Sequence, residues 1–511
     1  MPNSESNKRI AKNTILLYFR MFLTMGVSLY TSRIVLNTLG VEDFGIYNVV
    51  GGVVMMFSFL NSSMSSATQR FLSFELGKKD YAQLKKVFSM SVNIHTIIAV
   101  TIFILAETIG LWFLNTKLVI PDERMNAANW VYQFSIISFM LTVMNVPYNA
   151  TIIAHERMSV YAYVSIVEVI LKLIIVFVLV WMGFDKLKLY AVLVFGVSVV
   201  VWIIYKTYCK RNFTETNYQF FWEKSLYKTL INFSGWDLYG NMSVMARTQG
   251  VSILLNLFFG PILNAANGIA IQVQSAIMAF AGNVVMAIRP QIVKSYAIGD
   301  YNQTIKLVMT ATKYTYILLL FISLPILLEM HFILNLWLKE VPSYTVLFCQ
   351  YTLTFNFFAN MSVIVISAIH ATGKIKRPSL INGTLYLSVI PLSYVAFKLG
   401  GKPEMPYLIN VIFVLVGLLS NAWTLNLYLP QFSFRNFIIK VIGICMLITL
   451  ISGIIPGLIK ANQSEGWFRF ICVTTTSTLS IALTAYYIAM NSEMRLMVRS
   501  RISVFLTKHN I

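Results

Sequence analysis

Charged side chains inside long apolar stretches are the residues of this sequence best suited to chemistry. Arg20 and Arg33 lie within an apolar stretch at residues 16–40, and Arg247 lies within another, "SVMARTQGVSILL". A guanidinium in hydrocarbon costs about 2.5–3.5 kcal/mol even on a lenient scale, so such a residue pairs, faces water or reaches the headgroups. Arginine binds phosphate oxygens through two parallel hydrogen bonds, which makes these positions candidate sites for an anionic group.

The depth of each arginine separates the candidates. Arg247 lies about ten residues from the outer end of its stretch, roughly 15 Å deep on a helix, and Asp237 is too far along the helix to pair with it directly. We expect Arg247 to line an aqueous cavity or to form a buried ion pair. Arg20 and Arg33 can instead reach the headgroups. They are about 220° apart around a helix, so both cannot face one cavity wall.

Three further ionisable residues are candidates for coupling to an ion: Asp237, Glu168 and Lys172. Glu168 precedes Lys172 by four residues, a spacing that places both on one helix face and allows a local pair. Glu107 and Glu329 come late in two other apolar stretches, where we expect them to reach the outer headgroups.

Uncharged polar residues gather in two stretches. Asn61 lies in "FLNSSMSSATQR", and Asn267, Gln272 and Gln274 lie in a later stretch that ends at Arg289. Polar residues within a membrane usually face the interior of the bundle, although small and polar residues also serve tight helix packing. We expect these residues to line a cavity that binds hydroxyl-rich groups, with Arg289 as a further phosphate candidate or an ordinary orienting charge.

The composition indicates which elements carry these residues. The 511 residues are 57% hydrophobic and 12% charged, whereas soluble chains carry about 25% charged residues. About 14 apolar stretches approach the ~20 residues that a helix needs to cross a bilayer. The sequence therefore predicts an all-α polytopic membrane protein with about 14 transmembrane helices.

The net charge of +20 does not indicate a nucleic-acid partner. Lys and Arg concentrate in alternate loops, as the positive-inside rule describes, which predicts that both termini are cytoplasmic. The excess positive charge also attracts anionic membrane lipids. The tail "MRLMVRSRISVFLTKHNI" is predicted to lie as a helix on the membrane surface.

An internal repeat divides the chain. "DYAQLKK" at Asp80 and "DYNQTIK" at Asp300 are separated by the same interval as Gly40 and Gly260, and residues 152–166 resemble residues 369–383. We predict two parallel six-helix bundles, 1–220 and 221–430, with a helical hairpin and basic tail at 431–511. Parallel repeats of this kind build transporters whose substrate site lies between the halves.

Sequence signatures of enzymes are missing. The chain has no P-loop, GxSxG or HExxH sequence and no clustered carboxylates, and its 4 Cys and 5 His are scattered. We therefore expect no catalytic residues, no cofactor and no metal site.

Over residues 10–490 the chain resembles a known family. "SRIVLNTLGVEDFGIYNVVGG" and "MAIRPQIVKSYAIGDYNQ", placed on this topology, are similar to the polysaccharide (O-antigen, Wzx-type) flippases. Their superfamily also contains the MATE drug exporters and the lipid II flippases. The resemblance implies a V-shaped pair of bundles in the bacterial inner membrane. It also implies transfer of a polyprenyl-pyrophosphate-linked oligosaccharide to the outer leaflet, with a polysaccharide polymerase as a possible partner.

The sequence leaves two alternative functions open. A MATE-type H⁺- or Na⁺-coupled exporter should hold a deep carboxylate in its first bundle, where this chain has arginines. A lipid II flippase should carry a more arginine-rich first span. A membrane polymerase is disfavoured by the missing carboxylate and histidine clusters.

Overall fold

Helices make up every regular element of the residues that the structure describes. The structure is a computed structural model, and it describes residues 2–55, 58–116, 120–259, 261–338, 341–490 and 495–496. The predicted surface helix of the C-terminal tail falls almost entirely outside these ranges.

The predicted first repeat is helical in the part of the chain that the structure describes. Its elements are α1 (Pro2–Met55), α2 (Ser58–Lys78), α3 (Tyr81–Leu105), the π-helical turn η1 (Ala106–Gly110), α4 (Leu111–Thr116), α5 (Asp122–Ala154), α6 (Met158–Trp181), α7 (Lys186–Asn212) and the short η2 (Thr214–Thr216). Gly40, with φ 82° and ψ 167°, interrupts α1. Because φ is positive there, the break favours glycine.

The predicted second repeat and the C-terminal hairpin are also helical in the part of the chain that the structure describes. Their elements are α8 (Lys224–Phe259), α9 (Pro261–Ala297), α10 (Tyr301–Leu328), α11 (Met330–Trp337), α12 (Thr345–Thr372), α13 (Lys376–Lys398), α14 (Met405–Tyr428), α15 (Phe434–Phe437), η3 (Ile438–Gly443), α16 (Ile444–Asn462), α17 (Trp467–Thr484) and η4 (Ala485–Ala489).

Eleven helices of the described residues are long and apolar enough to cross a membrane. The chain is therefore a multi-pass membrane protein. Helix α8 has 36 residues and is not among the eleven. It carries Asp237, Asn241, Arg247 and Gln249 along its length, and these polar residues lower its hydropathy. Helices α1 and α2, which include undescribed positions, are not among them either.

The chain forms two compact units. Unit 1 consists of Met1–Met242, Met286–Asp300 and Gly373–Lys376, and unit 2 consists of Ser243–Val285, Tyr301–Thr372 and Arg377–Ile511. Helices α8 and α9 each contribute one end to unit 1 and the other to unit 2. The division predicted from the repeat, at residues 220 and 430, stays a prediction, because compactness and repetition define different boundaries.

Unit 1 is built around α5. This helix packs against α2, α3 and α7, and its buried Tyr132 and Ile136 belong to one of the two large apolar clusters of the unit. The Tyr132 hydroxyl donates to the carbonyl oxygen of Ala106 at 2.7 Å, at the first residue of η1. A Cβ atom at Gly110 would lie 2.0 Å from the Tyr132 hydroxyl oxygen, so this turn requires glycine.

The backbone repeats itself at the helix ends predicted to be equivalent. Lys79 and Gly299 both have positive φ, and in both places the next residue's N–H bonds to the carbonyl five residues earlier, from Asp80 to Glu75 and from Asp300 to Ser295. Glu156 and Gly373, between α5 and α6 and between α12 and α13, form a second pair with positive φ. These matches support the internal repeat.

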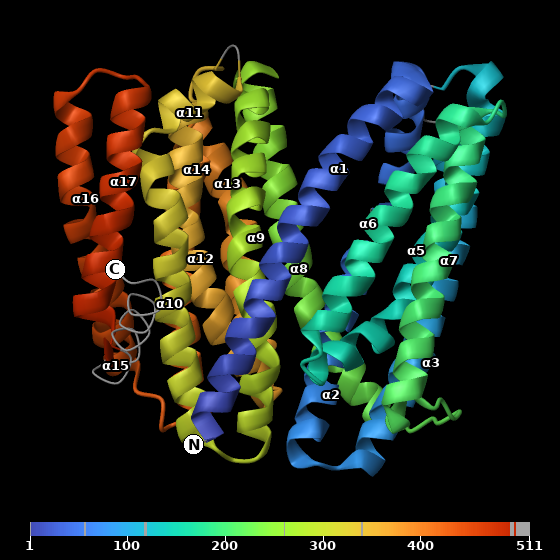
Figure 1. The fold of residues 1–511 in the computed structure, drawn as a ribbon, viewed down its shortest axis with the longest axis horizontal. Coiled ribbons are helices and arrows are strands. Elements are labelled where there is room, and N and C mark those ends of the chain that lie inside the picture. Colours follow the sequence, from blue (N-terminus) through green and yellow to red (C-terminus); the bar gives the residue numbers. More distant parts are fainter. Residues whose placement is uncertain are drawn as a thin grey trace, which may run out of the picture. The chain divides into compact units, whose positions relative to one another are not determined.

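In unit 2, α10 holds the C-terminal hairpin. Figure 1 shows α16 and α17 side by side next to α10, and both helices pack against it. Along α10, the Lys313 ammonium donates to Ala489 O at 2.8 Å, and Tyr316 and Thr449 hydroxyls lie 2.8 Å apart. These contacts fix the hairpin at one end and in the middle.

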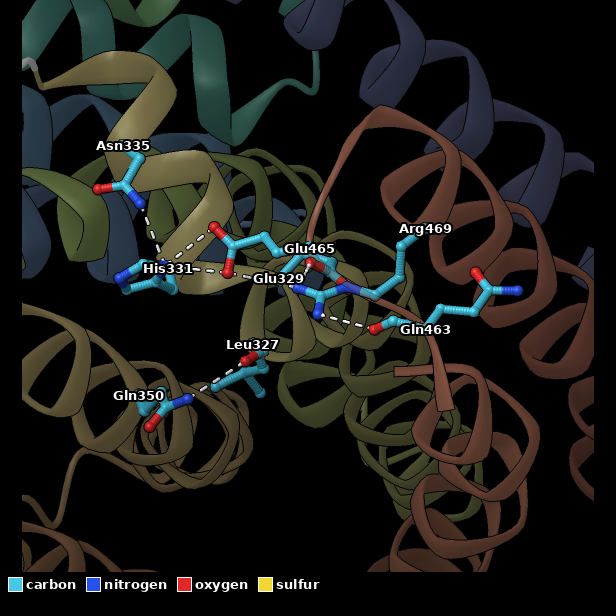
Figure 2. Close-up of polar contacts among 8 residues, drawn as sticks. All are labelled: Leu327, Glu329, His331, Asn335, Gln350, Gln463, Glu465 and Arg469. Carbon is cyan, nitrogen blue, oxygen red and sulfur yellow. Dashed lines mark hydrogen bonds and ion pairs between the residues drawn. The ribbon is translucent and has the colours of Figure 1, made fainter. Parts of the chain in front are cut away.

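An ion pair fixes the other end of the hairpin. Arg469 of α17 donates from Nε and Nη2 to the two carboxylate oxygens of Glu329, at 2.9 and 2.7 Å (Figure 2). Glu465 also accepts from His331 Nδ1 at 2.9 Å. The expectation that Glu329 reaches the outer headgroups is wrong, because its side chain is buried against this arginine.

Candidate functional site

Arg247 occupies a polar and aromatic pocket in unit 2. Its residue is only 9% exposed, and its Nη1 donates to Asn410 Oδ1 of α14 at 2.9 Å. The guanidinium carbon lies 4.9 Å from the ring centroids of Phe355 in α12 and Tyr386 in α13. Two aromatic faces and one amide therefore hold the cation, an arrangement in which the ring quadrupoles attract its charge.

A carboxylate partner is missing from this pocket. Within the described residues, Arg247 forms no ion pair, and its hydrogen bond to Asn410 is the one contact with an acceptor. Arginine has five N–H donors, so most of them remain available. Arg247 thus lines a small pocket of the described residues, and its role in binding stays a prediction.

The pocket around Arg247 is small. Its volume is about 50 Å³, and its polar lining includes Asn267, Gln274, Tyr407 and Thr352. The Tyr407 hydroxyl donates to Asn267 Oδ1 at 2.6 Å. The Gln274 amide donates to Asn356 Oδ1 at 3.1 Å. These bonds pre-orient the amides around the arginine, and a volume of this size suits a few waters or one small polar group.

Helix α9 presents only some of its predicted residues to this pocket. Asn267 and Gln274 line it together with Ile271, as their spacing of about one turn allows. Gln272 is exposed and lies on another face of α9, roughly 200° from Gln274 around the helix.

Arg289 lies elsewhere, at the far end of α9 within unit 1. Its Nη2 donates to Ser66 Oγ of α2 at 2.7 Å, and its charge interacts with that of Asp237. The Asn241 amide donates to Asp237 Oδ2 at 3.3 Å and to Ser63 Oγ at 3.2 Å. The structure therefore brings Arg289 and Asp237 together, which the sequence treated as separate candidates.

The remaining predicted arginine and asparagine positions lie on α1 and α2. The Arg20 guanidinium carbon lies 4.7 Å above the Tyr161 ring of α6, and its Nε is buried with no hydrogen-bond partner among the described residues. Arg33 and Asn61 are on α1 and α2, but their side chains lie outside what the structure describes.

Glu168 and Lys172 form the ion pair that their spacing predicts. Lys172 Nζ lies 2.6 Å from Glu168 Oε1 on α6. Both side chains line a cavity of about 480 Å³ in unit 1, between the last part of α1 and helices α5, α6 and α7. This cavity carries balanced charge, in contrast to the pocket of Arg247.

A buried carboxylate ties the end of α9 to the turn between α5 and α6. Glu156 is 4% exposed and has a φ of 60°. Its two carboxylate oxygens accept from Lys294 Nζ at 2.7 Å and from Gln291 Nε2 at 3.0 Å. The equivalent residue of the second repeat is Gly373, the default residue for this backbone conformation. Holding a non-glycine residue there costs of order 1–3 kcal/mol.

Sequence reasoning missed most neighbours of Arg247. Asn410, Tyr407, Phe355 and Tyr386 come from three helices far along the chain. A weak signal was present, because Tyr407 and Asn410 stand three residues apart within an apolar span and so share a helix face. That spacing gives no indication of which other helix the face meets.

The described residues contain no group of three His, Cys, Asp or Glu side chains that could hold a metal ion.

A sequence profile described as "polysaccharide biosynthesis protein" matches residues 10–294, more than half of the chain. The chain belongs to this family. None of the curated proteins compared with it matches. Family membership confirms the resemblance to polysaccharide flippases drawn from the sequence.

Solved structures show what fold this polysaccharide biosynthesis protein has. It is similar to an outward-facing multidrug resistance MATE family transporter of the MOP superfamily, with a TM-score of 0.70 and 14% identity, over 84% of this chain and 97% of that one. A MATE protein in a bent conformation matches at a TM-score of 0.70 and 12% identity, over 83% and 97%.

A third similar structure is a MOP superfamily transporter from Pyrococcus furiosus. It matches at a TM-score of 0.68 and 13% identity, over 83% of this chain and 96% of that one. At these identities the likeness shows the fold alone. The protein thus has the fold of MATE transporters.

Proposed function

We propose that the protein moves a polyprenyl-pyrophosphate-linked oligosaccharide from the cytoplasmic to the outer leaflet of the bacterial inner membrane. The observation that carries this proposal is Arg247, a buried cation that no described carboxylate neutralises, in a chain of the polysaccharide biosynthesis family. Such a cation is stable when an anionic ligand completes its partners, and a diphosphate matches the fork of donors that arginine offers.

The finer features of the proposal follow from the sequence. The transporter would have fourteen spans, both termini in the cytoplasm, and two six-helix bundles that alternate in access. Arg289, close to Asp237 and Ser66, would supply a second cationic position. Asp237 would be the main candidate for ion coupling, because Glu168 is engaged by Lys172. A polysaccharide polymerase would act on the exported product.

The second candidate function is export of small molecules, with the MATE structures as the observation in its favour. The Arg247 pocket opposes a cationic cargo, because like charges repel in a buried site. The similar Pyrococcus furiosus transporter is itself described by a reverse polarity of its binding pocket that suggests a different function. A resistance assay with a cationic dye separates the two functions. A lipid II flippase would be recognised by rescue of cell-wall synthesis instead.

The test replaces Arg247 in a strain whose own transporter gene is deleted, and measures surface glycan together with membrane abundance. Arg247→Ala and Arg247→Gln should abolish export, whereas Arg247→Lys should keep part of it, because the charge remains and only the fork is lost. Arg211→Ala, at an exposed position at the end of α7, is the matched control. Normal export by an abundant Arg247→Ala protein would remove this residue from the mechanism.

A further inference from the structure

The large cavity of unit 1 has the dimensions of a ligand site. Its volume of about 480 Å³ falls within the ≈ 300–1,000 Å³ of typical small-molecule pockets. Its polar walls come from Ser135, Ser138 and Thr142 on α5 and Ser198 on α7. Three of these residues lie on one helix at spacings of three and four, so they form a continuous hydroxyl stripe.

The ion pair in this cavity indicates that water reaches it. Helix α6 has the highest mean hydropathy of the eleven candidate spans, 2.7, yet Lys172 and Glu168 are 45% and 37% exposed there. Half-exposed charges in a membrane helix face a water-filled cavity rather than lipid. Because the two charges cancel, the cavity does not select its ligand by net charge.

Hydrogen-bonding capacity on the walls matches a ligand rich in hydroxyl groups. Ser138, Thr142 and Ser198 donate to carbonyls of their own helices, at 2.7, 3.1 and 3.2 Å, which leaves their oxygens as acceptors. Lys172 has further N–H donors, and the second oxygen of Glu168 is a further acceptor. The cavity thus offers mostly acceptors, with one ammonium among them.

Aromatic rings complete the lining. Tyr47, Phe134 and Phe139 border the same cavity. A pyranose ring has hydroxyl groups around its edge and apolar C–H groups on its faces, so it uses acceptors and flat apolar surfaces together. An inorganic ion would leave most of this volume empty, and an apolar drug would cover the remaining acceptor oxygens and ammonium hydrogens without bonding to them.

We propose that this cavity is a sugar-binding subsite that receives uncharged sugar residues of the oligosaccharide. The inference rests on the proposed function and deepens it, because it assigns sugar recognition to the hydroxyl-lined cavity of unit 1. Phosphate recognition then belongs to the arginine pocket of unit 2.

The experiment fills the cavity with one bulky side chain. Thr142→Trp should lower glycan export about tenfold or more, because a sugar residue that is excluded from the cavity is no longer held in the position that transport requires. Thr142→Val, which keeps the shape and removes one acceptor, should lower export about threefold, the effect of one hydrogen bond. Thr101→Trp is the matched control, since Thr101 is also exposed, also bonds to the carbonyl four residues earlier, and does not line the cavity.

A binding measurement separates loss of sugar recognition from loss of folding, because a merely misfolded variant would lose its response to both ligands. The purified full chain is titrated with the oligosaccharide released from the host's lipid-linked repeat unit, and separately with inorganic pyrophosphate. Thr142→Trp should lose the oligosaccharide response and keep the pyrophosphate response, and Arg247→Ala should do the reverse.

The outcomes separate this inference from the proposed function. If the wild-type gene fails to restore glycan export to the deletion strain, the proposed function is wrong. If the wild type restores export and an abundant Thr142→Trp protein exports equally well, the function stands and the sugar subsite is refuted. A wild-type protein that responds to pyrophosphate and not to the oligosaccharide would also refute the subsite.

Discussion

Two arginines of unit 2 are equally buried and have opposite surroundings. Arg247 and Arg469 are each 9% exposed. Arg469 binds both oxygens of Glu329 and also the carbonyl of Gln463, so its charge and donors are largely satisfied by the protein (Figure 2). Arg247 has two aromatic rings and one amide. Burial alone therefore does not distinguish these two arginines, whereas the presence of a carboxylate partner does.

The largest effect on stability should come from breaking the satisfied pair. Arg469→Leu leaves the buried Glu329 carboxylate uncompensated, which should lower the free energy of unfolding by about 3–5 kcal/mol. Arg247→Leu strands no carboxylate among the described residues and should change stability far less. Thermal unfolding of the purified proteins in nanodiscs measures both.

The double replacement Glu329→Leu with Arg469→Leu should recover most of the loss, because a buried pair can be replaced by apolar residues at little cost. Equal destabilisation by the two single arginine variants would break the comparison.

A smaller effect should follow from giving Arg247 the partner it lacks. Asn410→Asp places a carboxylate where the amide oxygen accepts at 2.9 Å. The charged hydrogen bond should raise the free energy of unfolding by about 1 kcal/mol. Glycan export should fall, because an anionic substrate would compete with a fixed internal anion.

The matched control for that change lies on the same helix. Asn421 is buried and bonded to Ser362 and Asn382, and no hydrogen bond joins it to a cation among the described residues. Asn421→Asp should therefore destabilise the protein through an unpaired buried charge. Full export by the Asn410→Asp protein would contradict the role given to Arg247.

The smallest effect concerns the exposed contact beside Arg469. The hydrogen bond from His331, followed by nearby positive charge, lowers the pKa of Glu465 below its ordinary value. Folding is therefore stabilised by this group above the unfolded-state pKa of about 4.3, and the stabilisation is lost as pH falls through the lower folded-state pKa. His331→Ala should reduce stability at pH 7 by less than about 1 kcal/mol, since exposed pairs contribute little. The difference from wild type in thermal midpoint should shrink below pH 4. If the difference in thermal midpoint grew below pH 4, the lowered pKa of Glu465 would be contradicted.

The features that could be predicted from the sequence depend on the spacing of residues within one helix or turn. The Glu168–Lys172 pair follows from a separation of four residues on one helix, and the distance of Asp237 from Arg247 follows from helical rise. The repeated helix ends, at Lys78 in α2 and at Ala297 in α9, were visible as Asp-Tyr pairs at a constant interval. Each of these depends on a single helix or turn.

The features that could not be predicted depend on packing between helices that are far apart in the sequence. The Arg469–Glu329 pair joins residues 140 positions apart, and the Arg247–Asn410 bond joins residues 163 positions apart. Helical periodicity shows which residues share a face and not which faces meet, so Glu329 looked like a residue that reaches the headgroups. The sequence identified Arg247 by its depth and left its neighbours unknown.

The strained turn at Glu156 would oppose any step of the proposed transport cycle that moves the end of α9. Any rearrangement that withdraws the last turns of α9 from the α5–α6 turn must break the bonds of both Lys294 and Gln291 to this carboxylate. Part of that loss is returned as the left-handed residue relaxes. Every 1.36 kcal/mol of the remainder slows the crossing tenfold. The contacts of Glu156 would therefore slow any step of a transport cycle that includes this rearrangement.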